Sequence, residues 1–283
     1  MLFLYAETTL CVVKLFVRYF ATDRELAREL VPIFPLQPML ELVMQDNTSV
    51  SMKYKIMQAL RNLTAGSVEI QPELLDHRSF APWLLRACAK NIANPTVEDR
   101  MLHVQTLGVT WNLCSLPHCA AKMLTLGVYD ALAMVLEMPH RDTQEMALLA
   151  LADIASTESG RLRLLDAHLA VSLCGLAKSL PPPTPGVLEG IMRVLFALSE
   201  SEYMKSKRRQ NGNSHFSTSA SNFTEDSLNL DTHFFRSMGI VDVIGHLLRN
   251  GGEMTKLLAL GEMLITQFEC SLLLTHLFKR YPH

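Results

Sequence analysis

The stretch KYKIMQALRNLT, residues 53–64, carries the periodicity that decides the fold. Its apolar residues Ile56, Ala59, Leu60 and Leu63 fall at positions i, i+3, i+4 and i+7, which is the spacing of one face of an α-helix. Similar helical spacing occurs along the chain, whereas hairpin dipeptides between alternating runs, the usual strand signal, are nearly absent. The sequence therefore predicts an all-α protein.

Composition and charge narrow the class of protein further. The 283 residues are 49% hydrophobic and 19% charged, and 26 Lys and Arg residues against 28 Asp and Glu residues give a formal net charge of −2. This composition excludes wholesale disorder, which requires low hydrophobicity and a high net charge. Because the charges nearly balance, the chain has no global electrostatic signature of nucleic-acid binding, and nucleic acid is not an expected partner.

A five-residue pattern recurs along the chain. It consists of a small or branched apolar residue, usually Leu, any residue, a polar residue and an aliphatic residue. Its copies are Ala59–Leu63, Val109–Leu113, Ala150–Ile154, Val194–Leu198 and Ala259–Met263. Their fourth positions lie 50, 41, 44 and 65 residues apart. Repeated units of this length indicate a solenoid, in which each unit buries its apolar face against the next.

A second pattern, a turn residue followed by an amphipathic helix, precedes some of these copies. It begins at Gly127 and at Gly239, and residues 30–43 look like a divergent earlier example. A glycine-led helix followed by an Ala-Leu-x-Asn-Leu helix resembles the armadillo repeat, and the related HEAT repeat shares much of the pattern. Over roughly residues 30–270, the resemblance implies a right-handed α-solenoid of about five to six armadillo- or HEAT-like repeats. We expect residues 1–283 to form one such solenoid.

The last interval exceeds the 41-residue interval by 24 residues, and residues 201–231 supply the excess. This segment is rich in Ser and Asn and lacks helical periodicity, so we expect a disordered insert. Its densest basic run comprises Lys205, Ser206, Lys207, Arg208 and Arg209. The run is compatible with a nuclear localisation signal, a kinase site, an electrostatic contact with an acidic partner or an ordinary solvated linker.

The resemblance also implies a binding surface. In armadillo proteins the third helices of the repeats line a concave surface, and the Asn of the pattern points into it. Its amide can both donate to and accept from a peptide backbone. By this resemblance the row of fourth positions reads Asn62, Asn112, Asp153, Ala197 and Glu262. One turn back lie Gln58, Gly108, Leu149, Arg193 and Leu258, and two turns back lie Lys55 and Gln105.

The expected function is that of a non-enzymatic interaction scaffold or adaptor, which binds an extended segment of a protein partner along this groove. The residues expected to anchor the partner's backbone are Lys55, Gln58, Asn62, Gln105 and Asn112, with Arg193 in the same strip. Asp153 and Glu262 would favour basic residues toward the other end. Importin-like members place Trp four residues before the Asn, and no such Trp occurs here. Trp111 is instead predicted to pack in the core with Val104, Leu107 and Cys114.

Two alternatives to groove binding stay open. The first is that the polar row is a solvated face that has no ligand. The chain could also be a structural subunit of a larger assembly, such as a cytoskeletal or centriolar one. It would then associate through the insert and through its apolar ends, residues 10–20 and 272–278.

Enzyme and metal motifs are absent from the sequence. It has no Gly-rich phosphate loop, no Gly-x-Ser-x-Gly and no His-Glu-x-x-His. The tightest candidate metal cluster, Cys114, His118 and Cys119, lacks a second ligand pair at zinc-site spacing. We therefore expect no enzymatic activity, no cofactor and no metal.

The cysteines and the longest apolar stretches bear on the compartment. Six scattered cysteines indicate buried free thiols rather than a disulfide framework. No uncharged stretch reaches the roughly 20 residues that a membrane span needs. We expect a cytoplasmic protein, with a nuclear location left open by the basic insert.

Overall fold

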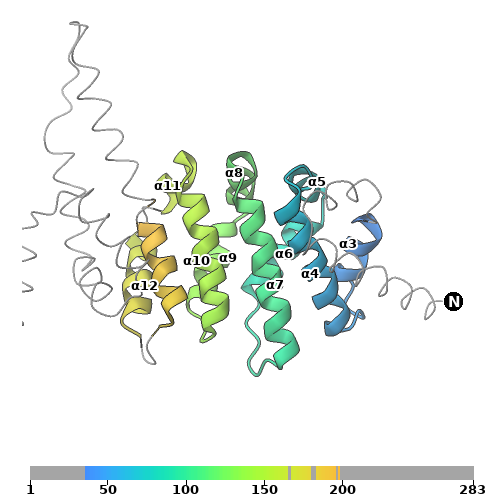
Figure 1. The fold of residues 1–283 in the computed structure, drawn as a ribbon, viewed down its shortest axis with the longest axis horizontal. Helices are drawn as coiled ribbons and strands as arrows, with labels where there is room; N and C mark the ends of the chain where they lie inside the picture. The colour runs from blue at the N-terminus through green and yellow to red at the C-terminus, as the bar shows by residue number, and fades with distance from the viewer. Residues whose placement is uncertain (1–35, 165–166, 180–182, 196, 198–283) are drawn as a thin grey trace, which may run out of the picture. The chain divides into compact units, whose positions relative to one another are not determined.

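The computed structural model describes residues 36–164, 167–179, 183–195 and 197, and every regular element within these residues is a helix (Figure 1). This confirms the predicted all-α class. The chain divides into two compact units, Met1–Thr157 and Glu158–His283. The prediction of a single solenoid over residues 1–283 stays a prediction, and the insert at 201–231 lies outside the described residues.

In the first unit, two short helices separate each long helix from the next. Their bounds are α3 Leu36–Met44, α4 Val50–Gly66, α5 Ile70–Asp76, α6 Phe80–Ala89, α7 Val97–Cys114, α8 Pro117–Thr125, α9 Val128–Leu136 and α10 Arg141–Ala155. The long helices α4, α7 and α10 lie side by side (Figure 1). The shorter helices follow the same order, because α5 contacts α8 and α6 contacts α9. Helices α5–α7 and α8–α10 are therefore two copies of one three-helix unit.

The described part of the second unit is also helical. It contains α11 Glu158–Leu164, α12 Ala167–Ala177 and a further helical segment over residues 185–195. The backbone N–H of Val187 points at the side-chain oxygen of Thr184 at 3.4 Å, so the hydroxyl caps the start of this segment.

Local signals in the sequence set where the helices of the first unit begin. Ser49 caps α4 by accepting from the N–H of Met52. Thr96 and Asp99 form a reciprocal capping box at the start of α7, and hydrogen bonds from Thr96 hold the pKa of the Asp99 carboxyl below its usual value. Gly127 separates α8 from α9 with φ 89° and ψ 27°, a left-handed conformation that glycine adopts readily.

The middle of α7 is buried on all sides. Thr106, Leu107, Gly108, Val109 and Thr110 are consecutive and all buried, and five residues span more than one helical turn. The two threonine hydroxyls donate to carbonyls one turn earlier in the same helix, at 2.9 and 3.1 Å. Every polar group of these side chains is thereby satisfied without water.

Three of the cysteines are buried free thiols, as predicted. They are Cys88, Cys114 and Cys119. The Cys88 sulfur lies 3.2 Å from the Thr110 hydroxyl, and burial raises the pKa of the Cys88 thiol to about 12.

Within the described ranges, no single helix is both long and apolar enough to cross a membrane. By length and composition alone, α8 and α9 pass that test as a pair, with a bend of 84° between them.

Replacing Gly127 with Ala should lower the free energy of unfolding by about 1–2 kcal/mol, because Ala must adopt φ 89°. Space is not the limit, since an added Cβ would meet only the Asp130 carboxylate at 3.8 Å. Urea denaturation followed by circular dichroism measures the change. Gly127→Asn is the matched control, and it should cost less because Asn tolerates the left-handed region. Equal losses for the two variants would contradict the conformational explanation.

Cys88 should be protected from alkylation in the folded chain. Iodoacetamide reacts with the thiolate, and a thiol with a pKa of about 12 is almost entirely protonated at pH 8. We expect labelling at least about 100-fold slower than in urea-unfolded chain, measured by mass spectrometry of the peptide that contains Cys88. Equal labelling rates would show that Cys88 is accessible in the native state.

Candidate functional site

The predicted row of polar residues lies on three neighbouring helices. All six side chains are half-buried. They are Lys55, Gln58 and Asn62 in α4, Gln105 and Asn112 in α7, and Asp153 in α10. We call the side of the first unit that carries them the long-helix face. It corresponds to the third-helix surface that the repeat pattern predicts.

The other predicted site residues lie outside the first unit. Arg193 belongs to the second unit, where its guanidinium pairs with the Glu189 carboxylate one turn earlier at 2.7 Å. Glu262 and the basic run Lys205, Ser206, Lys207, Arg208 and Arg209 lie outside the described residues. Their roles stay predictions.

Asn112 connects two repeats, a contact that was not predicted, and its binding role stays a prediction. Its side-chain nitrogen donates to the backbone carbonyl of Arg61 at 2.8 Å and to the Thr64 hydroxyl oxygen at 2.9 Å. The Thr64 hydroxyl in turn lies within donating distance of the carbonyls of Leu60 and Arg61. Both hydrogens of the Asn112 amide are therefore used to hold α7 against the last turns of α4. Only the carbonyl oxygen of this side chain can still serve a partner.

Trp111 also departs from its prediction. Leu107 and Cys114 are buried as expected, whereas Trp111 and Val104 are only half-buried. The indole N–H of Trp111 donates to the Asp153 carboxylate at 2.9 Å, which links α7 to α10. The helical spacing correctly placed Trp111 on the same side of α7 as Leu107 and Cys114. However, α7 packs against α4 on one side and α10 on the other. Trp111 therefore lies at the contact with α10 and not in the core.

Arg61, at the unspecified position of the repeat pattern, was not among the predicted site residues. Its side chain crosses from α4 over α7, and one guanidinium nitrogen lies 3.4 Å from the Gln105 side-chain oxygen. The other lies 3.9 Å from the sulfur of Met146 in α10. Gly108 leaves room for this path, because a Cβ there would lie 2.5 Å from the Cδ and Nε of Arg61. Gly108, one turn before Asn112, was the sequence signal for this path.

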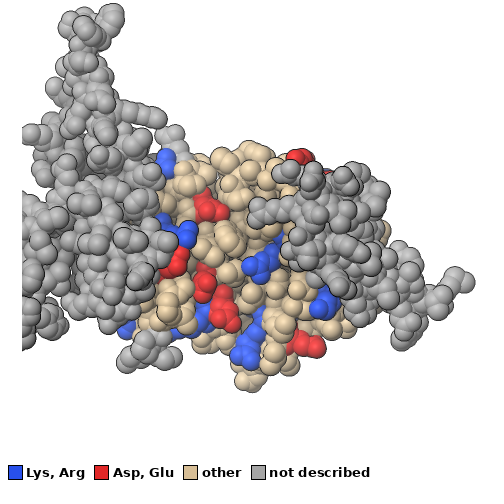
Figure 2. Space-filling model, viewed as in Figure 1, with Lys and Arg blue, Asp and Glu red and all other residues tan. Residues whose placement is uncertain are grey.

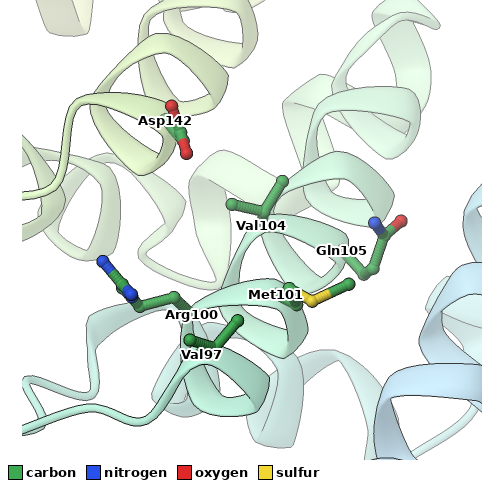
Figure 3. A pocket seen from close by; sticks show the side chains of 6 residues that line it. All are labelled: Val97, Arg100, Met101, Val104, Gln105 and Asp142. Atoms are coloured by element: carbon green, nitrogen blue, oxygen red, sulfur yellow. The ribbon is translucent and has the colours of Figure 1, made fainter.

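An open hollow lies between the first turns of α7 and α10. Its volume is about 360 Å³, and Figure 3 shows the lining side chains arranged around it. Val97 is 62% exposed and Met101 is 42% exposed, so apolar surface on its floor faces solvent. The lining residues are Val97, Arg100, Met101, Val104, Gln105 and Asp142.

Charges on this side of the molecule are mixed and sparse. Figure 2 shows basic side chains (Lys and Arg) and acidic side chains (Asp and Glu) interspersed among uncharged groups of the described residues. Over the described ranges, no group of three or more His, Cys, Asp or Glu side chains could hold a metal ion. The geometry there offers hydrogen-bonding groups and an apolar hollow.

Replacing Asn112 with Ala should lower the free energy of unfolding by about 1–2 kcal/mol. The loss follows because the Arg61 carbonyl and the Thr64 hydroxyl lose a donor at the α4–α7 contact. Urea denaturation of the full chain measures it. Ser115→Ala, which removes an exposed hydroxyl that donates to a carbonyl in the same turn, is the control and should change stability by less than about 0.5 kcal/mol. A neutral Asn112→Ala would rule out a structural role for this amide.

Comparisons with known proteins address the fold. No family model matches the sequence, and no curated protein matches it. Among solved structures, an engineered protein from a structural genomics consortium superposes with a TM-score of 0.69 at 16% identity, covering 93% of this chain and 91% of that one. A designed armadillo repeat protein in complex with the peptide (KR)4 gives 0.68 at 14% identity, covering 91% and 92%. Computationally designed armadillo repeat proteins for modular peptide recognition give 0.67 at 14% identity, covering 92% and 93%. Together with the repeated three-helix units, these similarities show that the chain has an armadillo-like repeat fold.

Proposed function

We propose that the chain is a non-enzymatic interaction scaffold that binds an extended segment of a protein partner across the long-helix face. The observation that carries the proposal is the combination of half-buried polar side chains on α4, α7 and α10 with an open apolar hollow between α7 and α10. Hollows with an apolar floor and a few polar groups at the rim are the usual form of a binding site.

The spacing of the helices suits an extended ligand. Packed helices lie about 8–10 Å apart, and an extended chain rises about 3.3 Å per residue. About two to three residues of a bound segment would therefore pass over each long helix. Within the chain, the Gln58 oxygen accepts from Lys55 and the Gln105 oxygen accepts from Arg61. The side-chain NH2 groups of Gln58 and Gln105 would donate to the segment's carbonyls, and the Asn112 carbonyl oxygen would accept from its backbone N–H groups.

The designed armadillo repeat protein of similar fold, solved with a bound peptide, supports this use of the fold. The alternative, a structural subunit of a larger assembly, depends on residues 10–20, 201–231 and 272–278. All three segments lie outside the described residues. A cytoplasmic location stays part of the proposal.

The hollow provides the test. A library of random 12-residue peptides displayed on phage would be selected against the full chain, and affinities of the enriched synthetic peptides would be measured by fluorescence anisotropy. Met101→Asp should weaken binding at least about tenfold, because it places a carboxylate on the apolar floor.

Met134→Asp is the matched control. Met134 is 51% exposed on α9, outside the long helices, so its replacement should leave the affinity within about twofold. A selection that enriches no peptide, or peptides that bind both variants as tightly as the wild type, would refute the proposed function.

A further inference from the structure

The helix at one end of the long-helix face carries only positive charge. Lys53, Lys55 and Arg61 are the ionisable Lys and Arg residues of α4, and its sequence VSMKYKIMQALRNLTAG contains no Asp or Glu. None of the three forms an ion pair with another described residue. Lys55 contacts the neutral Gln58 side chain and lies 4.8 Å from the centre of the Tyr54 ring. Burial lowers the pKa of Lys53 and the nearby Asp46 carboxylate partly opposes this shift, so Asp46 would compete with a negatively charged ligand at Lys53. Burial alone lowers the pKa of Arg61, with no opposing carboxylate.

Arg61 is the most enclosed of these cations. It is half-buried, and its two polar contacts are long ones to uncharged acceptors, 3.4 Å to the Gln105 oxygen and 3.9 Å to the Met146 sulfur. A guanidinium has five N–H donors and binds a carboxylate best in a two-point arrangement. Burial lowers the pKa of Arg61 and no described carboxylate opposes that effect, yet the group stays charged at neutral pH. Its charge is thus partly dehydrated without a counter-ion.

The guanidinium and the hollow are adjacent parts of one surface. Gln105 contacts Arg61 and also lines the hollow, while Asp142 lies on a different side of it (Figure 3). A side chain entering the hollow from an extended segment would therefore leave the next residues of that segment near Arg61.

We propose that Arg61 and the hollow together select a partner segment in which an Asp or Glu side chain lies within a few residues of an apolar one. The carboxylate accepts from the Arg61 guanidinium, and the apolar side chain enters the hollow over Val97, Met101 and Val104. This inference rests on the proposed function and names the chemistry of its ligand.

Charge along the face gives the segment a direction. Helix α4 is purely cationic, whereas α10 carries Asp142, Glu145 and Asp153 with Arg141. The acidic residue of the segment therefore belongs over α4 and α7, and any basic residue belongs over α10, where Asp153 was expected to favour one. The designed protein solved with (KR)4 holds a wholly basic peptide, so the preference at the α4 end here is the opposite.

The test measures how substitutions in the chain and in the peptide affect binding separately and together. Peptides enriched from the 12-residue phage library on full chain would be synthesised with their acidic residue intact and as the amide, Glu→Gln or Asp→Asn. For the wild-type chain we expect the amide to bind about 10- to 100-fold more weakly. For Arg61→Gln the two versions should bind within about twofold of each other. Arg61→Lys, which keeps the charge but loses the planar fork, should restore part of the difference.

The control is Arg86→Gln. Arg86 is an exposed arginine in α6, and its replacement should leave the difference between the two peptides unchanged. Should Arg61→Gln fail to fold by circular dichroism, the wild-type and Arg61→Lys measurements decide, because the preference for the acid must fall severalfold between them.

The outcomes separate the two proposals. Peptides whose binding is weakened by Met101→Asp but which show no acidic enrichment, or keep their acid preference in Arg61→Gln, would overturn this inference and leave the proposed function standing. Peptides insensitive to Met101→Asp, or no enriched peptide, would overturn both.

Discussion

The burial of α7 on both sides is the constraint on which the described face depends. Its middle turn is enclosed completely, from Thr106 to Thr110, so the helix must present one surface to α4 and another to α10. Polar side chains complete both contacts, because Asn112 reaches the last turns of α4 and Trp111 reaches Asp153 in α10. Because each repeat contacts only its neighbours, such contacts between repeats add directly to the packing within each repeat.

This two-sided packing decides which groups remain for a partner. Asn112 and Trp111 direct their donors to neighbouring helices, so the polar row is first of all a set of links between repeats. What stays open is the hollow between α7 and α10, together with the guanidinium of Arg61 beside it. Structure and recognition thus share one face, but they use different side chains.

The partial burial of the Arg61 guanidinium is energetically unfavourable, and no opposite charge among the described residues offsets it. Removing a charge from water is unfavourable unless an opposite charge or strong hydrogen bonds replace the lost hydration. Here the replacements are an amide oxygen and a thioether sulfur at long distances, and a glycine is needed at position 108 to admit the side chain. A carboxylate supplied by a partner would offset that cost at the moment of binding, which links the stability of the repeat stack to its selectivity.

The three-helix unit was implied by the resemblance to the armadillo repeat, whereas the sequence by itself determined the all-α class, the start of α9 at Gly127 and the recurrence of a repeat. These depend on helical periodicity and turn chemistry, which are local properties of the chain. It also placed Lys55, Gln58, Asn62, Gln105, Asn112 and Asp153 on the three long helices. Only the tertiary structure decided what those side chains contact. The bond from Asn112 to Arg61 joins residues 51 positions apart, and the path of Arg61 depends on a glycine in another helix. Such contacts are set by the rotation and separation of packed helices, which no local pattern encodes.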